Sequence, residues 1–470
     1  MAPQLFVRFN GWAKGAMLLA ALLAGACSTP RPRNVLIVTL DTMRADRLPP
    51  YGFSGVATPA LDRIAAEGAL FEQAFAAVPL TLPSHSTLFT GLFPPKLGVR
   101  DNAGAPLASE FRTLAEILGE RGLATGAFVS SAVLAPGRGL DQGFGTYSTG
   151  ASPSCAGSPR ARRSADRVVD DAMAWITERG SAPFFAWMHF YDTHRPYRLP
   201  DEFARSYADP YAAAIAFEDA QIQRLLDALE ALGRLDDTLL VVVGDHGESL
   251  GDHGEDSHGI LIYQEALHVP LMMRGPGIVP RRVSATVRMA DVMPTVLDLL
   301  GMEPPPMDAV SMTNLLDGAA DRRPRDVYAE SLYPERFGWA SLRSLRTGRY
   351  KIIDAPRPEL FDLVTDPYEQ RNLYASKPSL AAAMHRGLTS FQDEAEKADG
   401  ATPLDPDVAG RIASLGYVSG APAAIADGPG DERDPKDMIE TFNQMTRVQW
   451  ARGALQSRIP EKCSPAGRGL

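Results

Sequence analysis

Continuous hydrophobic runs alternate with amphipathic stretches along the first half of the chain. The clearest run, Asn34–Leu40, is rich in β-branched residues and is followed at once by Asp41. This pattern predicts a strand that is buried on both faces and ends in a carboxylate. Further strands are predicted at 124–129, 183–190 and 238–243, and the helices before them at 113–121, 164–179 and 211–232. Helices that alternate with buried strands predict an α/β fold with a mostly parallel sheet covered by helices on both faces.

Polar clusters follow three of the predicted strands directly. They are Asp41-Thr42, Asp192-Thr193-His194 and Asp245-His246. Ligands of open α/β sheets bind outside the carboxyl ends of the strands, so these clusters are expected to meet in one site. Thr58 and Pro59 predict the start of another helix that runs to about Phe75, with Thr58 as its N-cap.

The second half of the chain predicts a smaller unit and a tail. A strand at 349–354 and a turn at Asp366-Pro367 fall in a small C-terminal subdomain at 323–398. This subdomain follows a larger body at 28–322, which is the expected catalytic domain. A linker rich in Ala, Gly and Pro at 419–430 precedes one helix at 435–456, within a tail at 399–470. The length of 470 residues fits two to three domains, or one large α/β body with a small appendage.

The N-terminus has the features of an export signal. Arg8 and Lys14 precede a short apolar run, and small residues then lead to Cys27. The stretch 23–27 resembles a bacterial lipobox, which predicts cleavage of residues 1–27, lipidation of Cys27 and a membrane-anchored protein of the periplasm or cell surface. Plain secretion without lipid is the alternative. Cys155 and Cys463 imply no disulfide framework.

Charge and histidine placement narrow the function. The formal net charge is −10 and no basic block stands out, which argues against a nucleic-acid partner. Six of the eight histidines lie between His189 and His268, several of them beside acids. This clustering indicates metal or acid–base chemistry.

Three segments then resemble the signature segments of sulfatases in the alkaline phosphatase superfamily. They are Asp41-Thr42-Met43-Arg44-Ala45-Asp46, the stretch 81–91 that begins Thr81-Leu82-Pro83-Ser84-His85, and Gly244-Asp245-His246-Gly247-Glu248. Matches at His194-Arg195-Pro196-Tyr197, His258-Gly259 and Tyr350-Lys351 extend the resemblance over residues 34–375. The resemblance implies an alkaline-phosphatase-like α/β fold with a small C-terminal α+β subdomain, and it implies an ester hydrolase.

The chain departs from the sulfatase pattern at the nucleophile. Typical sulfatases carry Cys or Ser at the position of Thr81 and oxidise it to formylglycine. Formylglycine is not expected here, because oxidation of Thr would leave a ketone. A threonine ester must be cleaved by water at sulfur or phosphorus, which is the ordinary route of phospho-enzyme intermediates, so Thr81 favours phosphoesters over sulfate esters.

The metal set implied by the resemblance is Asp41, Thr81, Asp245 and His246. Thr42 stands where sulfatases usually have a second Asp, and His246 replaces an amide. An imidazole with few carboxylates suits zinc or manganese better than calcium. A second metal held by Asp192, His194 and His258, and a single metal with both histidines on the substrate, remain open.

The remaining roles follow from the same comparison. Thr81, His194 and His258 are the expected catalytic residues, and His85 and Lys96 are expected to contact the substrate. The histidines His189, His253 and His268 are expected to be structural.

Three functions remain in view. The first is hydrolysis of a sulfate or phosphate ester of a small molecule or an envelope glycan. The others are an envelope phosphoryl-group transferase that resembles phosphoethanolamine transferases, and an inactive scaffold lipoprotein. The sequence predicts no oligomeric state.

Overall fold

The fold is described from a computed structural model that covers residues 31–150, 163–319, 325–392 and 433–456. An eight-stranded sheet forms its centre, in the order β4-β3-β5-β1-β6-β7-β2-β8. Along the chain the strands are β1 (Asn34–Leu40), β2 (Ala69–Phe75), β3 (Ala124–Phe128), β4 (Thr146–Ser148), β5 (Phe184–Phe190), β6 (Thr238–Gly244), β7 (His268–Arg274) and β8 (Arg281–Arg288). Only β7 runs antiparallel to its neighbours in this sheet, β6 and β2.

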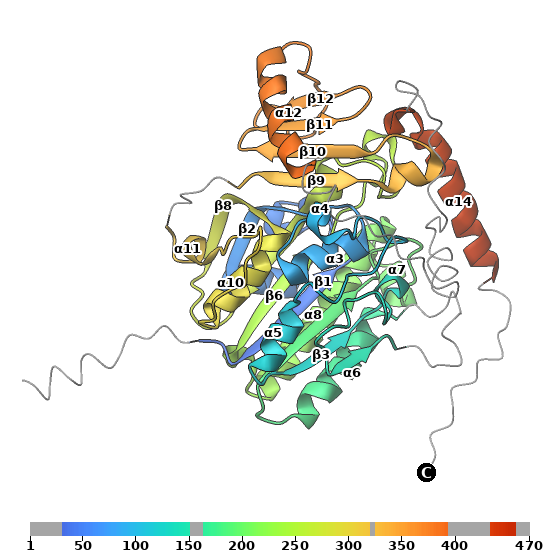
Figure 1. The fold of residues 1–470 in the computed structure, drawn as a ribbon. Coiled ribbons are helices and arrows are strands. Elements are labelled where there is room, and N and C mark those ends of the chain that lie inside the picture. The colour runs from blue at the N-terminus through green and yellow to red at the C-terminus, as the bar shows by residue number, and fades with distance from the viewer. Residues whose placement is uncertain (1–30, 151–162, 320–324, 393–432, 457–470) are drawn as a thin grey trace, which may run out of the picture.

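Helices cover both faces of the sheet, and each face has its own core (Figure 1). One core contains Val35 and Ile37 of β1 and packs against α3 (Thr81–Thr90), α5 (Leu114–Glu120) and α10 (Val292–Leu299). The other contains Leu36 and Val38 and packs against α2 (Pro59–Glu67), α6 (Ala165–Glu178) and α8 (Pro210–Ala231). Alternate side chains of one strand thus feed opposite cores, which explains why the run is apolar throughout.

The predicted strands and helices of the α/β body are confirmed to within about two residues, apart from one helix. The helix predicted from Thr58 to Phe75 is wrong, because α2 ends at Glu67 and the chain continues as β2. Gly68 makes the change of direction possible, since a Cβ there would lie 2.2 Å from the carbonyl oxygen of Met273 on β7. The Thr58 side chain makes no capping bond. Asp219 of α8 accepts the first N–H groups of α2 instead.

A small antiparallel sheet packs on one end of the body. It has the order β12-β11-β10-β9, formed by β9 (Val327–Ser331), β10 (Leu342–Thr347), β11 (Tyr350–Asp354) and β12 (Glu359–Asp362). Helix α12 (Pro378–Gln392) covers it through a separate core that includes Leu345, Ile352 and Leu388. This is the α+β subdomain that the sequence predicts.

Short helices and one long C-terminal helix complete the described chain. The short ones are α4 (Pro94–Leu97), α7 (Asp201–Ala204), α9 (Gln264–Leu267) and α11 (Thr313–Leu316). The C-terminal helix α14 (Ile439–Gln456) packs on the body through Ile439 and Phe442. None of the described helices is long and apolar enough to cross a membrane. The predicted export signal, Cys27 and the linker at 419–430 lie outside the described residues.

Candidate active site

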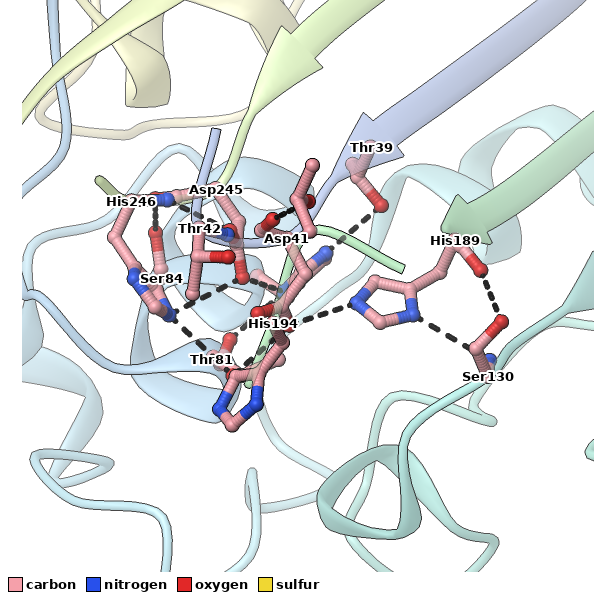
Figure 2. A network of polar contacts seen from close by, with 12 residues as sticks. Thr39, Asp41, Thr42, Thr81, Ser84, Ser130, His189, His194, Asp245 and His246 are labelled. Atoms are coloured by element: carbon pink, nitrogen blue, oxygen red, sulfur yellow. Dashed lines mark hydrogen bonds and ion pairs between the residues drawn. The ribbon is translucent and has the colours of Figure 1, made fainter. Parts of the chain in front are cut away.

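The polar clusters that the sequence predicts at strand ends do converge at one edge of the sheet (Figure 2). Asp41 follows β1, while Asp245 and His246 follow β6, which pairs with β1 in parallel. Thr81 is the first residue of α3. All four side chains are fully buried.

Thr81 Oγ lies between an acid and an imidazole. It is 3.2 Å from Asp41 Oδ2 and 3.5 Å from His246 Nε2. The nearest imidazole nitrogen of His246 is free to accept, because its other nitrogen, Nδ1, donates to the carbonyl oxygen of Gly247 at 2.9 Å. Burial lowers the pKa of His246 to about 3, so the ring is neutral and Nε2 carries a lone pair. The Thr81 hydroxyl therefore faces the Asp41 carboxylate and the His246 ring, and all three groups can bind the same cation.

The carboxylates of this cluster have oxygen atoms that the protein leaves unsatisfied. Asp245 Oδ1 accepts the backbone N–H groups of Thr42 at 3.1 Å and His246 at 2.7 Å. Among the described residues, Asp41 Oδ1 and Asp245 Oδ2 are buried without a hydrogen-bond partner. Burial and the charge of Asp41 raise the pKa of Asp245 well above its usual value. Buried carboxylate oxygens of this kind are normally hydrogen-bonded, paired with a cation or bound to a metal.

A divalent cation fits the cluster. Asp41, Asp245 and His246 each offer one ligand atom within 4.8 Å of the others, as do His85, His189 and Asp245. Oxygen and nitrogen donors of this kind are common ligands of divalent cations.

The backbone is strained where β1 enters the site. Thr42 has a φ of 55°, a left-handed conformation that is rare for a β-branched residue. Tyr211 holds it there, since its hydroxyl donates to the Thr42 carbonyl at 2.7 Å and accepts from the Arg44 N–H at 2.9 Å. The turn aims the Thr42 N–H at Asp245 rather than along the strand. Strain of about 1–3 kcal/mol is typical of functional sites.

Two histidines surround the cluster in ways that the sequence did not predict. His189, which the sequence assigned a structural role, accepts the Ser130 N–H at Nδ1 and directs Nε2 to Asp41 Oδ2 at 3.1 Å. Although burial would raise the pKa of Asp41, this contact and nearby imidazoles hold it below its usual range. The functional assignment went to the polar cluster at 192–194, which follows β5, whereas His189 lies within β5 itself.

His85 lies behind Thr81, whereas the sequence predicted a substrate contact. Its Nδ1 donates to the Thr81 carbonyl at 2.8 Å, and its Nε2 is 3.0 Å from Thr39 Oγ. Burial lowers the pKa of His85 to about 3. With both nitrogens used inside the protein, this neutral ring supports the first turn of α3.

His194 and His258 form the other wall of the site. Their rings lie 5.1 Å apart, and the ring of His258 is 4.6 Å from that of His246. Glu248, fully buried, places Oε2 3.4 Å from His258 Nδ1. Burial lowers the pKa of His258, but the charge of Glu248 outweighs this and raises it above its usual value. His258 is thus suited to act as a cation.

Two predicted site residues point elsewhere. Asp192 Oδ2 accepts the Ala165 N–H at 2.9 Å, at the start of α6. No metal-binding group among the described residues includes Asp192, so the structure gathers only the two histidines of the predicted second metal set. Lys96, on α4, is paired with Asp308.

Asn102 is a site residue that the sequence analysis missed. Its Oδ1 accepts the N–H of Leu82, the residue after Thr81, at 2.8 Å. Its Nδ2 is buried with no hydrogen-bond partner among the described residues. No local pattern in the sequence marks it, because it lies in an irregular segment twenty residues after Leu82, the residue that it contacts.

The fold and this cluster together define a hydrolase with an alkaline-phosphatase-like α/β fold. Among solved structures, phosphonate monoester hydrolase of Agrobacterium radiobacter superposes with a TM-score of 0.66 and 23% identity, covering 80% of this chain and 100% of that one. Another, solved with its substrate D-glucosamine-2-N,6-O-disulfate, has a TM-score of 0.65 and 21% identity over 78% of this chain and 99% of that chain.

The sequence comparisons then give the family. The model of the family described as Sulfatase matches residues 33–302, and that described as N-sulphoglucosamine sulphohydrolase, C-terminal, matches residues 251–394. The chain belongs to the sulfatase family. A Δ4,5-hexuronate-2-O-sulfatase of Bacteroides thetaiotaomicron is 24% identical over 85% of this chain and 97% of its own length. The protein is accordingly a sulfatase-family ester hydrolase.

Proposed function

We propose that this hydrolase cleaves sulfate or phosphate esters through Thr81 as nucleophile, with a divalent metal held by Asp41, Thr81, Asp245 and His246. The observation that carries the proposal is the position of Thr81 Oγ, 3.2 Å from Asp41 Oδ2 and 3.5 Å from His246 Nε2. Zinc or manganese is favoured over calcium, because His246 presents a nitrogen donor.

The residues of the chain divide the chemistry between them. A bound divalent cation lowers the pKa of a hydroxyl and takes up charge that develops on the ester oxygens. Thr81 Oγ, as the alkoxide, bonds to phosphorus or sulfur while the bond to the alcohol breaks. The alcohol leaves with a proton from protonated His258. Asn102 Nδ2 is buried with no hydrogen-bond partner among the described residues, and this supports a role in donating to an oxygen of the transferred group.

The second half of the reaction regenerates the enzyme. Water attacks the phosphorus or sulfur atom of the Thr81 ester and gives a proton to the now neutral His258. The bond to Thr81 Oγ breaks, so that the alkoxide and the protonated His258 are both restored. His194, whose ring is 5.1 Å from that of His258, lines the same wall and contributes positive charge when protonated.

The substrate class is proposed to be a sulfated or phosphorylated glycan or a small-molecule ester. One relative is named as a sulfatase of a hexuronate, and one structural neighbour was solved with a disulfated glucosamine as its substrate. Another structural neighbour is named for phosphonate monoesters. Thr81 favours the phosphorus ester. Water must cleave a threonine ester at the phosphorus or sulfur atom, and this is the ordinary route of phospho-enzyme intermediates.

The test is turnover by the chain lacking residues 1–27, loaded separately with zinc, manganese or calcium. Aryl sulfate, aryl phosphate monoester and aryl phosphate diester are compared for the parent, Thr81→Ala and Thr87→Ala. Thr87 is a matched control, because it is buried on the same helix and, among the described residues, its hydroxyl bonds to the Pro83 carbonyl alone. We expect phosphoester turnover with zinc or manganese that Thr81→Ala abolishes and Thr87→Ala retains. Full activity in Thr81→Ala would overturn the nucleophile assignment.

We further propose that the protein is exported and anchored through a lipid on Cys27. The short apolar run before Cys27 supports this. Cys27→Ser is expected to move the enzyme from the membrane fraction to the soluble one on cell fractionation. An unchanged distribution would contradict the anchor.

A further inference from the structure

The C-terminal helix α14 lies against the segment that leads to His258. Figure 1 shows α14, in dark red, along the right side of the body. The match to the family's C-terminal model ends at residue 394, so α14 is outside the part shared with that model. Its contacts with the body can therefore contribute something that the family match does not describe.

One side chain of α14 holds the backbone of this segment at two points. Asn443 Nδ2 donates to the Gly254 carbonyl at 2.7 Å, and Asn443 Oδ1 accepts the Asp256 N–H at 2.9 Å. Asn443 is only 3% exposed. Because both bonds go to the main chain, they fix two peptide groups four and two residues before His258.

The segment that Asn443 holds is not a regular element. Leu250, Gly251, His253 and Gly254 all have left-handed backbone conformations, two of them non-glycine residues with φ of 53° and 49°. On its inner side, the buried Glu255 carboxylate accepts the N–H groups of Ile260 and Leu261. Asn443 supplies the corresponding restraint on the outer side. A loop with strained residues keeps one shape only when neighbouring groups over-determine it.

Two more residues of α14 contact the same region. Arg447 forms an ion pair with Asp256, which lies in the segment itself. Trp450 lies 5.5 Å from the guanidinium of Arg195, the residue after His194. Helix α14 therefore contacts residues close in sequence to His194 and to His258, the two histidines that form the other wall of the active site.

We propose that Asn443 is a positioning residue for His258, so that α14 forms part of the active-site structure. The inference rests on the proposed role of His258 as the proton donor to the leaving alcohol. Proton transfer requires the donor within hydrogen-bond reach of its target, and a displacement of about 1 Å can lower a rate by up to about 100-fold. Releasing the Gly254 and Asp256 peptide groups would allow such a displacement without removing any group that reacts.

The experiment is a double-mutant cycle in the full chain, with the metal and ester that give Thr81-dependent turnover. Asn443→Ala is expected to lower kcat by about tenfold with a smaller change in KM, since the loss falls on the chemical step. In a His258→Ala background, the same substitution is expected to have almost no further effect. Asn443→Asp keeps the acceptor for Asp256 but loses the donor to Gly254. Its kcat is expected to lie between those of the parent and Asn443→Ala.

Two controls separate positioning from stability. Gln444→Ala removes a neighbour on α14 whose side chain bonds to Glu440 alone in the part of the chain that the structure describes, and it is expected to leave kcat unchanged. Leu388→Ala destabilises the separate core of the small subdomain and is expected to lower the melting temperature without lowering kcat. An equal loss of kcat in Leu388→Ala, or the same tenfold loss in both His258 backgrounds, overturns the inference. No loss in His258→Ala itself overturns the proposed role of His258 instead.

Discussion

Asp245→Asn is expected to stabilise the metal-free protein and to destabilise the metal-loaded one. Asp245 is fully buried, and one of its oxygens has no hydrogen-bond partner among the described residues. Its ligand oxygen lies within 4.8 Å of that of Asp41. Two like charges at this separation repel by about 3 kcal/mol at an effective dielectric constant of about 20. An amide removes this charge, keeps an acceptor for the Thr42 N–H, and can donate to Asp41.

The sign of the effect with pH follows from the raised pKa of Asp245. An acid whose pKa is raised by folding makes the folded state less stable above its unfolded pKa of 3.8. The stability advantage of the variant without metal should therefore grow as the pH rises from 3.8 toward neutrality. With zinc or manganese bound, the carboxylate is a ligand, so the parent becomes the more stable of the two.

The assay is urea unfolding of the parent and the variant, each with a chelator and with saturating metal. We expect the difference in unfolding free energy to change sign between the two conditions. Asp219→Asn is the matched control, because Asp219 is another buried carboxylate, with a pKa raised to about 6, but it caps α2. Its effect should be the same with and without metal. A difference of one sign for Asp245→Asn in both conditions would refute a metal site at this carboxylate.

Three other substitutions test the surroundings of the site. Arg44→Ala should lower the free energy of unfolding by about 2 kcal/mol in urea unfolding, because this buried guanidinium donates to the carbonyl oxygens of Glu248 and Ser249 in the loop after β6. The His268→Gln variant should lose less folding stability than the parent as the pH falls. Burial lowers the pKa of His268 from 6.5 to about 4, so the parent loses stability as the pH falls from 6.5, by about 3 kcal/mol at pH 4. Urea midpoints at pH 5 and pH 7 measure this, and equal acid losses in both proteins would contradict it. His189→Ala should weaken metal binding at least about tenfold in chelator competition, since it orients Asp41. Unchanged affinity would remove His189 from the metal site.

The sequence predicted the parts of the structure that depend on local pattern. Strand β1, the helices α5, α6 and α8, and the convergence of Asp41 with Asp245 all followed from apolar runs that end in polar residues. Strand β2 did not, because its seven residues include Glu72 and Gln73 and continue a helical pattern. Its extended conformation comes from pairing with β7 and β8, which local sequence does not report.

Side-chain direction at the site was also beyond the sequence. Asp192 and His194 were considered as possible ligands of one second metal. β5 ends at Phe190, and both residues lie where the chain turns after it, so the side-chain alternation of a strand does not apply to them. His85 and His189 differ from their predicted roles for a similar reason. His85 contacts Thr39 in β1 and His189 contacts Asp41 directly after β1, and only the packed fold brings these partners within reach.

The central place of β1 has a consequence for how the chain folds during synthesis. This strand is made first, but its two partners, β5 and β6, are residues 184–190 and 238–244. Until both have emerged, β1 is a seven-residue apolar segment with two unpaired edges, the kind of segment that aggregates. Pairings so distant in sequence form slowly. The Asp41 and Asp245 carboxylates can meet only after β6 has joined the sheet, so an ion that needs both is bound late, by an almost complete α/β body.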